Sequence, residues 1–291
     1  MAITAAMVKE LRERTGAGMM ECKGALVEAN GDLDAAAEQM RISGLAKADK
    51  KSGRVAAEGV IAVEASADGK SVAMAEINCE TDFVAKGDDF TGFAQDVCKA
   101  ALAGNPADIE ALGALDCGGK TIELVRQELV SKLGENIQIR RFVRRDMNDG
   151  IAGVYKHGER IGVVTEVSGS EPLARDIAMH VAASRPICIG EADVPAEVLA
   201  QEKKILVAEA AESGKPAEII EKMVEGRLRK YLAEITLLGQ PFVKNPDQTV
   251  EKLLKSEDAQ AYFFERYEVG EGIEKKTEDF AAEVMAQVKG N

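Results

Sequence analysis

The sequence predicts an α+β protein built from several compact units within 291 residues. Apolar residues recur at helical spacing over residues 1–45 and again over 195–238. Two intervening pairs of segments alternate instead with a period of two, as strands do, and each pair is followed by a helical pattern. An apolar fraction of 46% is ample for packed cores, while 4% aromatic content makes those cores aliphatic.

Residues 1–54 are predicted to form a three-helix domain that ends in a basic linker. Thr4 is placed to cap the first helix, and Gly16 breaks it. The second helix ends at Asn30-Gly31, where a left-handed turn is expected. Asp32 then caps a third helix, which we expect Gly44 to end. Residues 47–54 are polar and basic, and are predicted to be a linker.

Residues 55–145 and 146–275 are predicted to be two α+β subdomains with antiparallel sheets. The first begins with strands at 60–64 and 71–77 around a turn at Asp68-Gly69. Helices near 90–102 and 121–133 and a strand at 137–143 follow. The second begins with strands at 150–155 and 161–167 that turn at His157-Gly158. Because residues 93–98 (FAQDVC) are echoed by 173–178 (LARDIA), we interpret the two units as a duplication.

An antiparallel helical hairpin is predicted as an insertion at about 195–236, with the apolar seam of a coiled coil. Gly214 followed by Pro216 indicates a helix stop and restart. A strand near 262–269 is expected to return to the second subdomain. Residues 276–291 are predicted to be a C-terminal helical module, capped at Thr277 and presenting Phe280 and Val284 on one face.

Charge and cysteine usage restrict the classes of function. Lys and Arg number 37 against 50 Asp and Glu, so the net charge of −13 disfavours direct nucleic-acid binding. The five cysteines include no CxxC pair, which is typical of reduced thiols in a cytoplasmic protein. No run of about 18 apolar residues is present, so no membrane contact is expected.

The sequence contains no convincing catalytic, cofactor or metal site. Residues 114–121 (ALDCGGKT) end like a phosphate-binding loop, but Ala114 stands where that motif needs glycine. His180 lies in an Ala-rich helical segment and is expected to be a core or edge histidine. His157 is expected to be exposed at its turn. With neither a second nearby histidine nor paired cysteines, we predict no bound metal, no cofactor and no enzyme activity.

One segment departs from the local patterns. Thr81-Asp82-Phe83-Val84 follows an apolar strand, precedes a helix, and places an aromatic residue among acidic ones. From the residues alone, the favoured interpretation is structural, with Asp82 as a helix N-cap and Phe83 packed into the core. A contact site for a partner protein is the alternative.

Two long motifs resemble signatures of the bacterial elongation factor Ts family. They are residues 8–23 (VKELRERTGAGMMECK) and 76–86 (EINCETDFVAK). The resemblance continues through 134–137 (GENI), 155–158 (YKHG), 214–216 (GKP), 239–243 (GQPFV) and 269–274 (VGEGIE), so it covers essentially the whole chain. Gly24 departs from the family pattern, which usually has a basic residue there. This departure predicts the loss of one N-terminal contact or of some helix stability.

The resemblance implies a guanine nucleotide exchange factor for the GTPase elongation factor Tu, which binds the GDP form and stays bound until GTP enters. It implies a ubiquitin-associated (UBA)-like N-terminal domain, the duplicated core, the coiled-coil hairpin and the C-terminal module. Thr81, Asp82, Phe83 and Val84 would disturb the partner's Mg²⁺ and phosphate site. Further partner contacts implied by the resemblance are Leu11, Met19, Met20, Lys23, Leu133, Gly134, His157 and Phe280. For Leu11 and Met19, a pure core role is an equal alternative.

Three other classes of function are left open by the residues. They are a nucleotide-binding enzyme using Lys120, a ribosome- or RNA-associated adaptor using residues 47–54, and a coiled-coil scaffold in which residues 81–84 are dispensable. The sequence also leaves open whether the complex with the GTPase has 1:1 or 2:2 stoichiometry.

Overall fold

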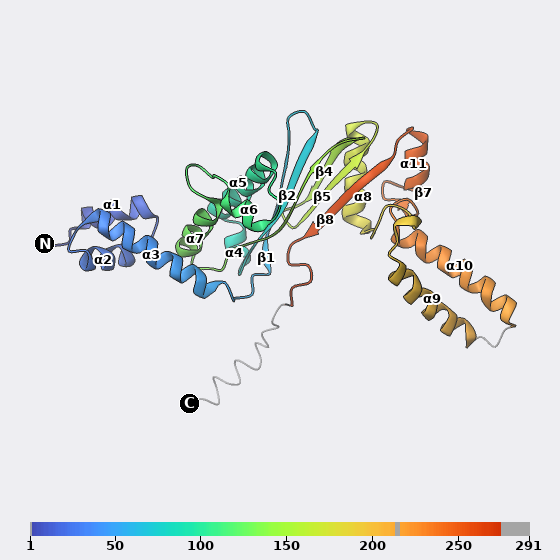
Figure 1. Cartoon of the computed structure of the whole chain (residues 1–291), viewed down its shortest axis with the longest axis horizontal. Coiled ribbons are helices and arrows are strands. Elements are labelled where there is room, and N and C mark those ends of the chain that lie inside the picture. Colours follow the sequence, from blue (N-terminus) through green and yellow to red (C-terminus); the bar gives the residue numbers. More distant parts are fainter. Residues whose placement is uncertain (1, 213–215, 275–291) are drawn as a thin grey trace.

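The computed structural model describes residues 2–212 and 216–274, except for the side chains of 45–47 and 49, and has the predicted α+β character with small antiparallel sheets (Figure 1). The helices are α1 (Ala5–Thr15), α2 (Met19–Glu28), α3 (Leu33–Lys51), α4 (Asp82–Ala85), α5 (Asp88–Gly104), α6 (Ile109–Ala114), α7 (Ile122–Leu133), α8 (Glu171–Ser184), the 3₁₀ turn η1 (Glu191–Asp193), α9 (Ala196–Ala211), α10 (Ala217–Ile235) and α11 (Val250–Ser256). The strands are β1 (Glu58–Ala65), β2 (Ser71–Cys79), β3 (Gln138–Asp146), β4 (Ile151–His157), β5 (Ile161–Val167), β6 (Pro241–Phe242), β7 (Asn245–Thr249) and β8 (Ala261–Glu268).

Helices α1, α2 and α3 pack around a small apolar core. Leu11, Cys22 and Leu26 are fully buried at its centre. The predicted caps are confirmed: the Thr4 hydroxyl accepts the Met7 amide at 3.3 Å, and Asp32 accepts the amides of residues 34 and 35. Asn30 and the glycines at 16 and 31 have positive φ, as the helix stops require.

The third helix is longer than predicted. It continues through Gly44 to Lys51, so the predicted linker over residues 47–54 is wrong except for its last three residues. The reason is tertiary packing: α3 lies against α7, and a Cβ on Gly44 would approach the Ser131 hydroxyl to 3.2 Å. One turn later, Ala48 is 2% exposed within the core of the first sheet. Glycine is tolerated in this helix because it permits that close approach.

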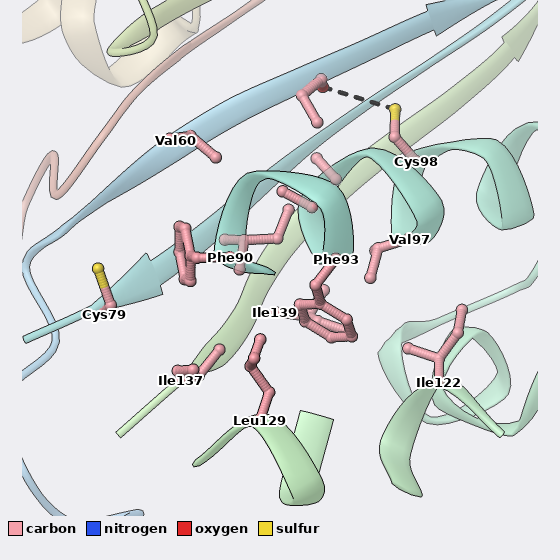
Figure 2. Close-up of a cluster of buried hydrophobic side chains, with 14 of the residues drawn as sticks. Val60, Cys79, Phe90, Phe93, Val97, Cys98, Ile122, Leu129, Ile137 and Ile139 are labelled. Carbon is pink, nitrogen blue, oxygen red and sulfur yellow. Dashed lines mark hydrogen bonds between the residues drawn. The ribbon is translucent and has the colours of Figure 1, made fainter. Parts of the chain in front are cut away.

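The first sheet has the order β1-β2-β3 and is antiparallel throughout. Its hairpin turns at Gly69, which has a φ of +66° as expected for residues 68–69. On β1, Val60 faces the helical core while the next residue, Ile61, faces the opposite side of the sheet. Helices α5 and α7 cover one face, where Phe90, Phe93 and Leu129 interdigitate with strand residues (Figure 2).

The second sheet has the order β4-β5-β8, also antiparallel, and α8 covers its outer face. The turn at His157-Gly158 and the returning strand are confirmed. Each sheet is therefore a hairpin covered by the helix that follows it and completed by a later strand. The two sheets pack face to face through an apolar layer that includes Ile61, Met74, Val164 and Tyr267.

Two buried glutamates lie between the sheets. Glu76 on β2 accepts hydrogen bonds from the Gly270 amide at 2.8 Å and from Arg140 and Arg141 at 2.9 and 2.6 Å. Burial alone would raise the pKa of Glu76, but these donors outweigh it and lower that pKa. Adjacent strand residues normally face opposite sides, so a register shift opposite Glu76 is needed for both arginines to reach one carboxylate. Glu166 on β5 has the equivalent environment, with Arg145 and two loop amides.

Helices α9 and α10 form a hairpin that projects from the second sheet (Figure 1). Leu206, Ala210 and Val224 make its buried seam, whereas Ile205 and Ile219 are exposed. The predicted break falls on residues 213–215, and the predicted C-terminal helix with Phe280 falls on 275–291. Both ranges lie outside the described residues. Strands β6 and β7 and helix α11 were not predicted.

His180 fastens the base of this hairpin to α8. Its ring accepts the Val243 amide at Nδ1 (3.2 Å) and donates from Nε2 to Gln240 at 3.0 Å, which defines a neutral tautomer. Gln240 in turn donates to the carbonyls of Ser184 and Glu234. The predicted core histidine is therefore confirmed, and burial lowers its pKa.

We predict that His180 makes the protein sensitive to mild acid. Because its folded-state pKa lies below the unfolded value of about 6.5, its contribution to stability is complete above that pH and is lost as the pH falls below it. Urea denaturation at about pH 7.5 and about pH 5.5 measures the effect. His180→Gln should lower stability at the higher pH and show a smaller further loss at the lower one. An equal pH-dependent loss in both proteins would contradict this assignment.

We also predict that Gly24 weakens α2. A Cβ at this position meets no atom within 4 Å, so Gly24→Ala should raise the free energy of unfolding by about 0.5–1 kcal/mol. Gly44→Ala is the matched control, because its Cβ would crowd Ser131. Urea denaturation of both variants compares the two sites, and equal gains would contradict the account.

Candidate functional site

The tip, defined as Thr81-Asp82-Phe83-Val84, lies where the chain leaves the buried end of β2. Thr81 has an extended backbone, and its hydroxyl accepts the Val84 amide at 3.4 Å. Thr81 is therefore the N-cap of the single turn α4, and the expectation that Asp82 is the cap is wrong. Asp82 is already the first helical residue. The Cys79 thiol just before the tip donates to the Thr81 carbonyl, and its burial raises its pKa to about 12.

Phe83 points away from the core. It is 84% exposed, more than any other large apolar side chain in the described part of the chain, so packing into the core, the structural alternative, is wrong. Val84 is half-buried against the core of the first sheet, and Ala85 is buried in it. The turn is thus anchored on one side while it presents a phenyl ring on the other. The ring is therefore accessible to another molecule.

Asp82 adds a negative charge beside this ring. The Lys86 ammonium lies 2.6 Å from its carboxylate, and this hydrogen bond lowers the pKa of Asp82. The carboxylate is therefore ionised at neutral pH, and the Asp82 side chain remains 52% exposed. It is available to a cation or a hydrated metal ion on another molecule, and it repels phosphate.

Two glutamates that the sequence reasoning did not single out hold the tip. Glu135 accepts the amides of Glu80 and Thr81 at 3.0 and 2.9 Å and the Thr81 hydroxyl at 2.6 Å. In return, Glu80 accepts the Asn136 amide at 2.6 Å and lies 3.4 Å from the Arg54 guanidinium. The sequence signal was the GENI motif at 134–137, but no local pattern indicates a contact across more than fifty residues.

The other predicted contacts are spread over separate elements. On α2, Met19 and Met20 are 61% and 78% exposed, and Lys23 is exposed as well. Gly134 is exposed beside Glu135 as the left-handed C-cap of α7, and Leu133 is half-buried against the core. Glu135, the residue that follows these two, hydrogen-bonds to the tip.

Two further positions are not brought to the tip. His157 is exposed at the β4–β5 turn, with its ring 6.3 Å from that of Tyr155. Leu11 is fully buried in the N-terminal core, so its side chain is not available to a partner and the core alternative holds. Phe280 lies outside the described residues.

The loop that resembles a phosphate-binding motif does not have that geometry. It is preceded by helix α6 rather than a strand. The Cys117 amide donates to the Lys120 carbonyl at 2.7 Å, and the Gly119 amide donates to Asp116. The Lys120 ammonium is held by both oxygens of Glu128 at 2.7 Å. Because these groups are already paired within the protein, the loop offers no cradle for phosphate.

The described residues include no group of three or more His, Cys, Asp or Glu side chains placed to hold a metal ion. None of the described helices is long and apolar enough to cross a membrane.

The fold is a mixed helix-and-sheet architecture, and its tip exposes an aromatic ring beside an ionised carboxylate. A family model described as Elongation factor TS matches residues 80–271. Over the full length of both chains, the protein is 61% identical to Elongation factor Ts of Thioalkalivibrio sulfidiphilus and 62% identical to that of Alkalilimnicola ehrlichii. It is 61% identical to Elongation factor Ts of Methylococcus capsulatus, again over both full chains. The chain belongs to the elongation factor Ts family.

Proposed function

We propose that this chain is a guanine nucleotide exchange factor for elongation factor Tu that carries out no covalent chemistry. Membership of the family supports the partner. The observation that supports the mechanism is the 84% exposed Phe83 beside the ionised Asp82 on a turn held by Glu135. In this proposal the tip enters the Mg²⁺ and phosphate region of the GTPase, and the complex persists until GTP binds.

The mechanism is a thermodynamic coupling. A GTPase holds GDP largely through its phosphates and a Mg²⁺ ion. A protein that binds the nucleotide-free GTPase more tightly than the loaded form weakens nucleotide binding by the same factor. A thousand-fold weakening requires a coupling free energy of about 4 kcal/mol.

The tip supplies only part of that coupling. Burying a phenylalanine side chain contributes about 1.5–3 kcal/mol, so insertion of Phe83 accounts for roughly ten- to hundred-fold. Asp82 would add repulsion toward the phosphates or rearrange the water shell of the metal. The rest must come from a broad interface. Our candidates are the exposed Met19, Met20 and Lys23 of α2, together with Gly134, His157 and Phe280.

We also infer the finer domain layout from the family. Helices α1–α3 are proposed to be the ubiquitin-associated-like domain, the two helix-covered hairpins the duplicated core, and α9–α10 the coiled coil. The similar burial of α5 and α8 against their sheets supports the duplication.

The proposed function is tested by release of a fluorescent GDP analogue from elongation factor Tu in excess unlabelled GDP. We expect the chain to accelerate release by about a thousand-fold at saturation, the factor that corresponds to the coupling above. An equal concentration of an unrelated acidic protein is the control. Release at the spontaneous rate would contradict the proposal.

Phe83→Ala is predicted to lower the stimulated release rate about ten- to hundred-fold, because the variant cannot bury the ring in the partner. Its free energy of unfolding should change by less than about 0.5 kcal/mol, since the side chain is exposed. Ile187→Ala removes another exposed apolar side chain, 52% exposed and distant in sequence from the tip, and should release GDP normally. Normal exchange by Phe83→Ala would exclude insertion of the ring.

A further inference from the structure

The backbone that carries Phe83 has little order of its own. Helix α4 is four residues long, well below the length at which a helix is stable alone. The Glu80 and Thr81 amides lie just beyond the last residue of β2, where pairing with β1 and β3 has ended. Val84 and Ala85 anchor one side of the turn on the core, and the path of the chain into the turn depends on what binds these two amides.

Both oxygens of Glu135 are used for this purpose. One oxygen accepts the two amides at 3.0 and 2.9 Å, and the other accepts the Thr81 hydroxyl at 2.6 Å. Hydrogen bonds to an ionised acceptor are about twice as strong as neutral ones, and three converging donors define one position for Thr81. The Thr81 hydroxyl then caps α4, which passes the constraint on to Phe83.

Glu135 is itself held in place. It follows Gly134, whose positive φ of +81° ends α7, and it precedes Asn136, which is 1% exposed. The Asn136 side-chain amide donates to the carbonyls of Ser52 and Arg54 at 3.2 and 2.7 Å. The hydrogen bonds of Glu135, here called the clamp, thus join the tip to the end of α7. Those of Asn136 join the same loop to the segment that follows α3.

We propose that Glu135 is a positioning residue for nucleotide exchange: it holds the Glu80–Thr81 backbone so that Phe83 reaches the GTPase in a single orientation. This inference rests on the proposed exchange function. Without the clamp, the tip must be ordered when the ring inserts, and that ordering opposes the displacement step. The proposed contacts on α2 and at His157 lie on other elements and are unchanged. Replacing Glu135 therefore lowers the GDP release rate at a saturating concentration of the chain. The concentration of the chain that gives half of the maximal rate changes little.

The test compares stimulated GDP release for the full-length chain and for Glu135→Ala, Glu135→Gln, Phe83→Ala and the double variant Glu135→Ala/Phe83→Ala. Glu251→Ala is the matched control, since it removes a glutamate that pairs with Lys255 on α11. For Glu135→Ala we expect about a tenfold lower rate at saturation, which corresponds to about 1.4 kcal/mol, with half-saturation changed less than about threefold. Glu135→Gln retains a carbonyl acceptor and the shape of the side chain, so its rate should be intermediate.

The double variant separates positioning from a general structural role. If Glu135 acts only through the ring, Glu135→Ala should have no further effect once Phe83 is alanine. Additive losses, or a wild-type rate for Glu135→Ala, would overturn the inference while the proposed function stands. If the wild-type chain itself fails to accelerate release, the proposed function is wrong and this inference with it. Should Glu135→Ala fail to fold by circular dichroism, the same comparisons are made with Glu135→Gln.

Discussion

The carboxylate of Glu135 is the interaction on which the exposed tip depends. Strand β2 is paired on both sides through most of its length, but that pairing ends before Glu80. Glu135 replaces the missing neighbouring strand by accepting the next two amides of the chain. The exposed Phe83 and the paired Asp82 therefore follow two residues whose amides are hydrogen-bonded within the protein.

The two sheets behind the tip are held together by buried ion pairs as well as by apolar packing. Glu76 and Glu166 are buried between the two sheets, and each carboxylate is satisfied by arginine and by backbone amides. The Gly270 amide reaches Glu76 across 194 residues, which ties the end of the second sheet to the centre of the first. The proposed partner contacts lie on separate elements, and this frame would keep the spacing between them fixed.

Local rules predicted what local interactions determine. The Thr4 and Asp32 caps, the glycine turns and the period-two strands all appear where the residues indicate. The end of α3 was predicted wrongly, because packing on α7 outweighs the cost of Gly44 within a helix. The structural interpretation of Phe83 also failed, since a staple into the core and an exposed ring have the same local sequence. The hydrogen bonds of Glu135 could not be predicted, because their donors lie more than fifty residues away in the sequence and come close only in the folded chain.

Hydrogen exchange at the Thr81 amide measures whether the tip backbone is fixed before any partner arrives. In the isolated protein, we predict that this amide is protected to the same degree as amides in the paired part of β2. We also predict that Glu135→Ala abolishes this protection while leaving the strand protected. Exchange of the wild-type Thr81 amide at the rate of an unstructured peptide would contradict the account.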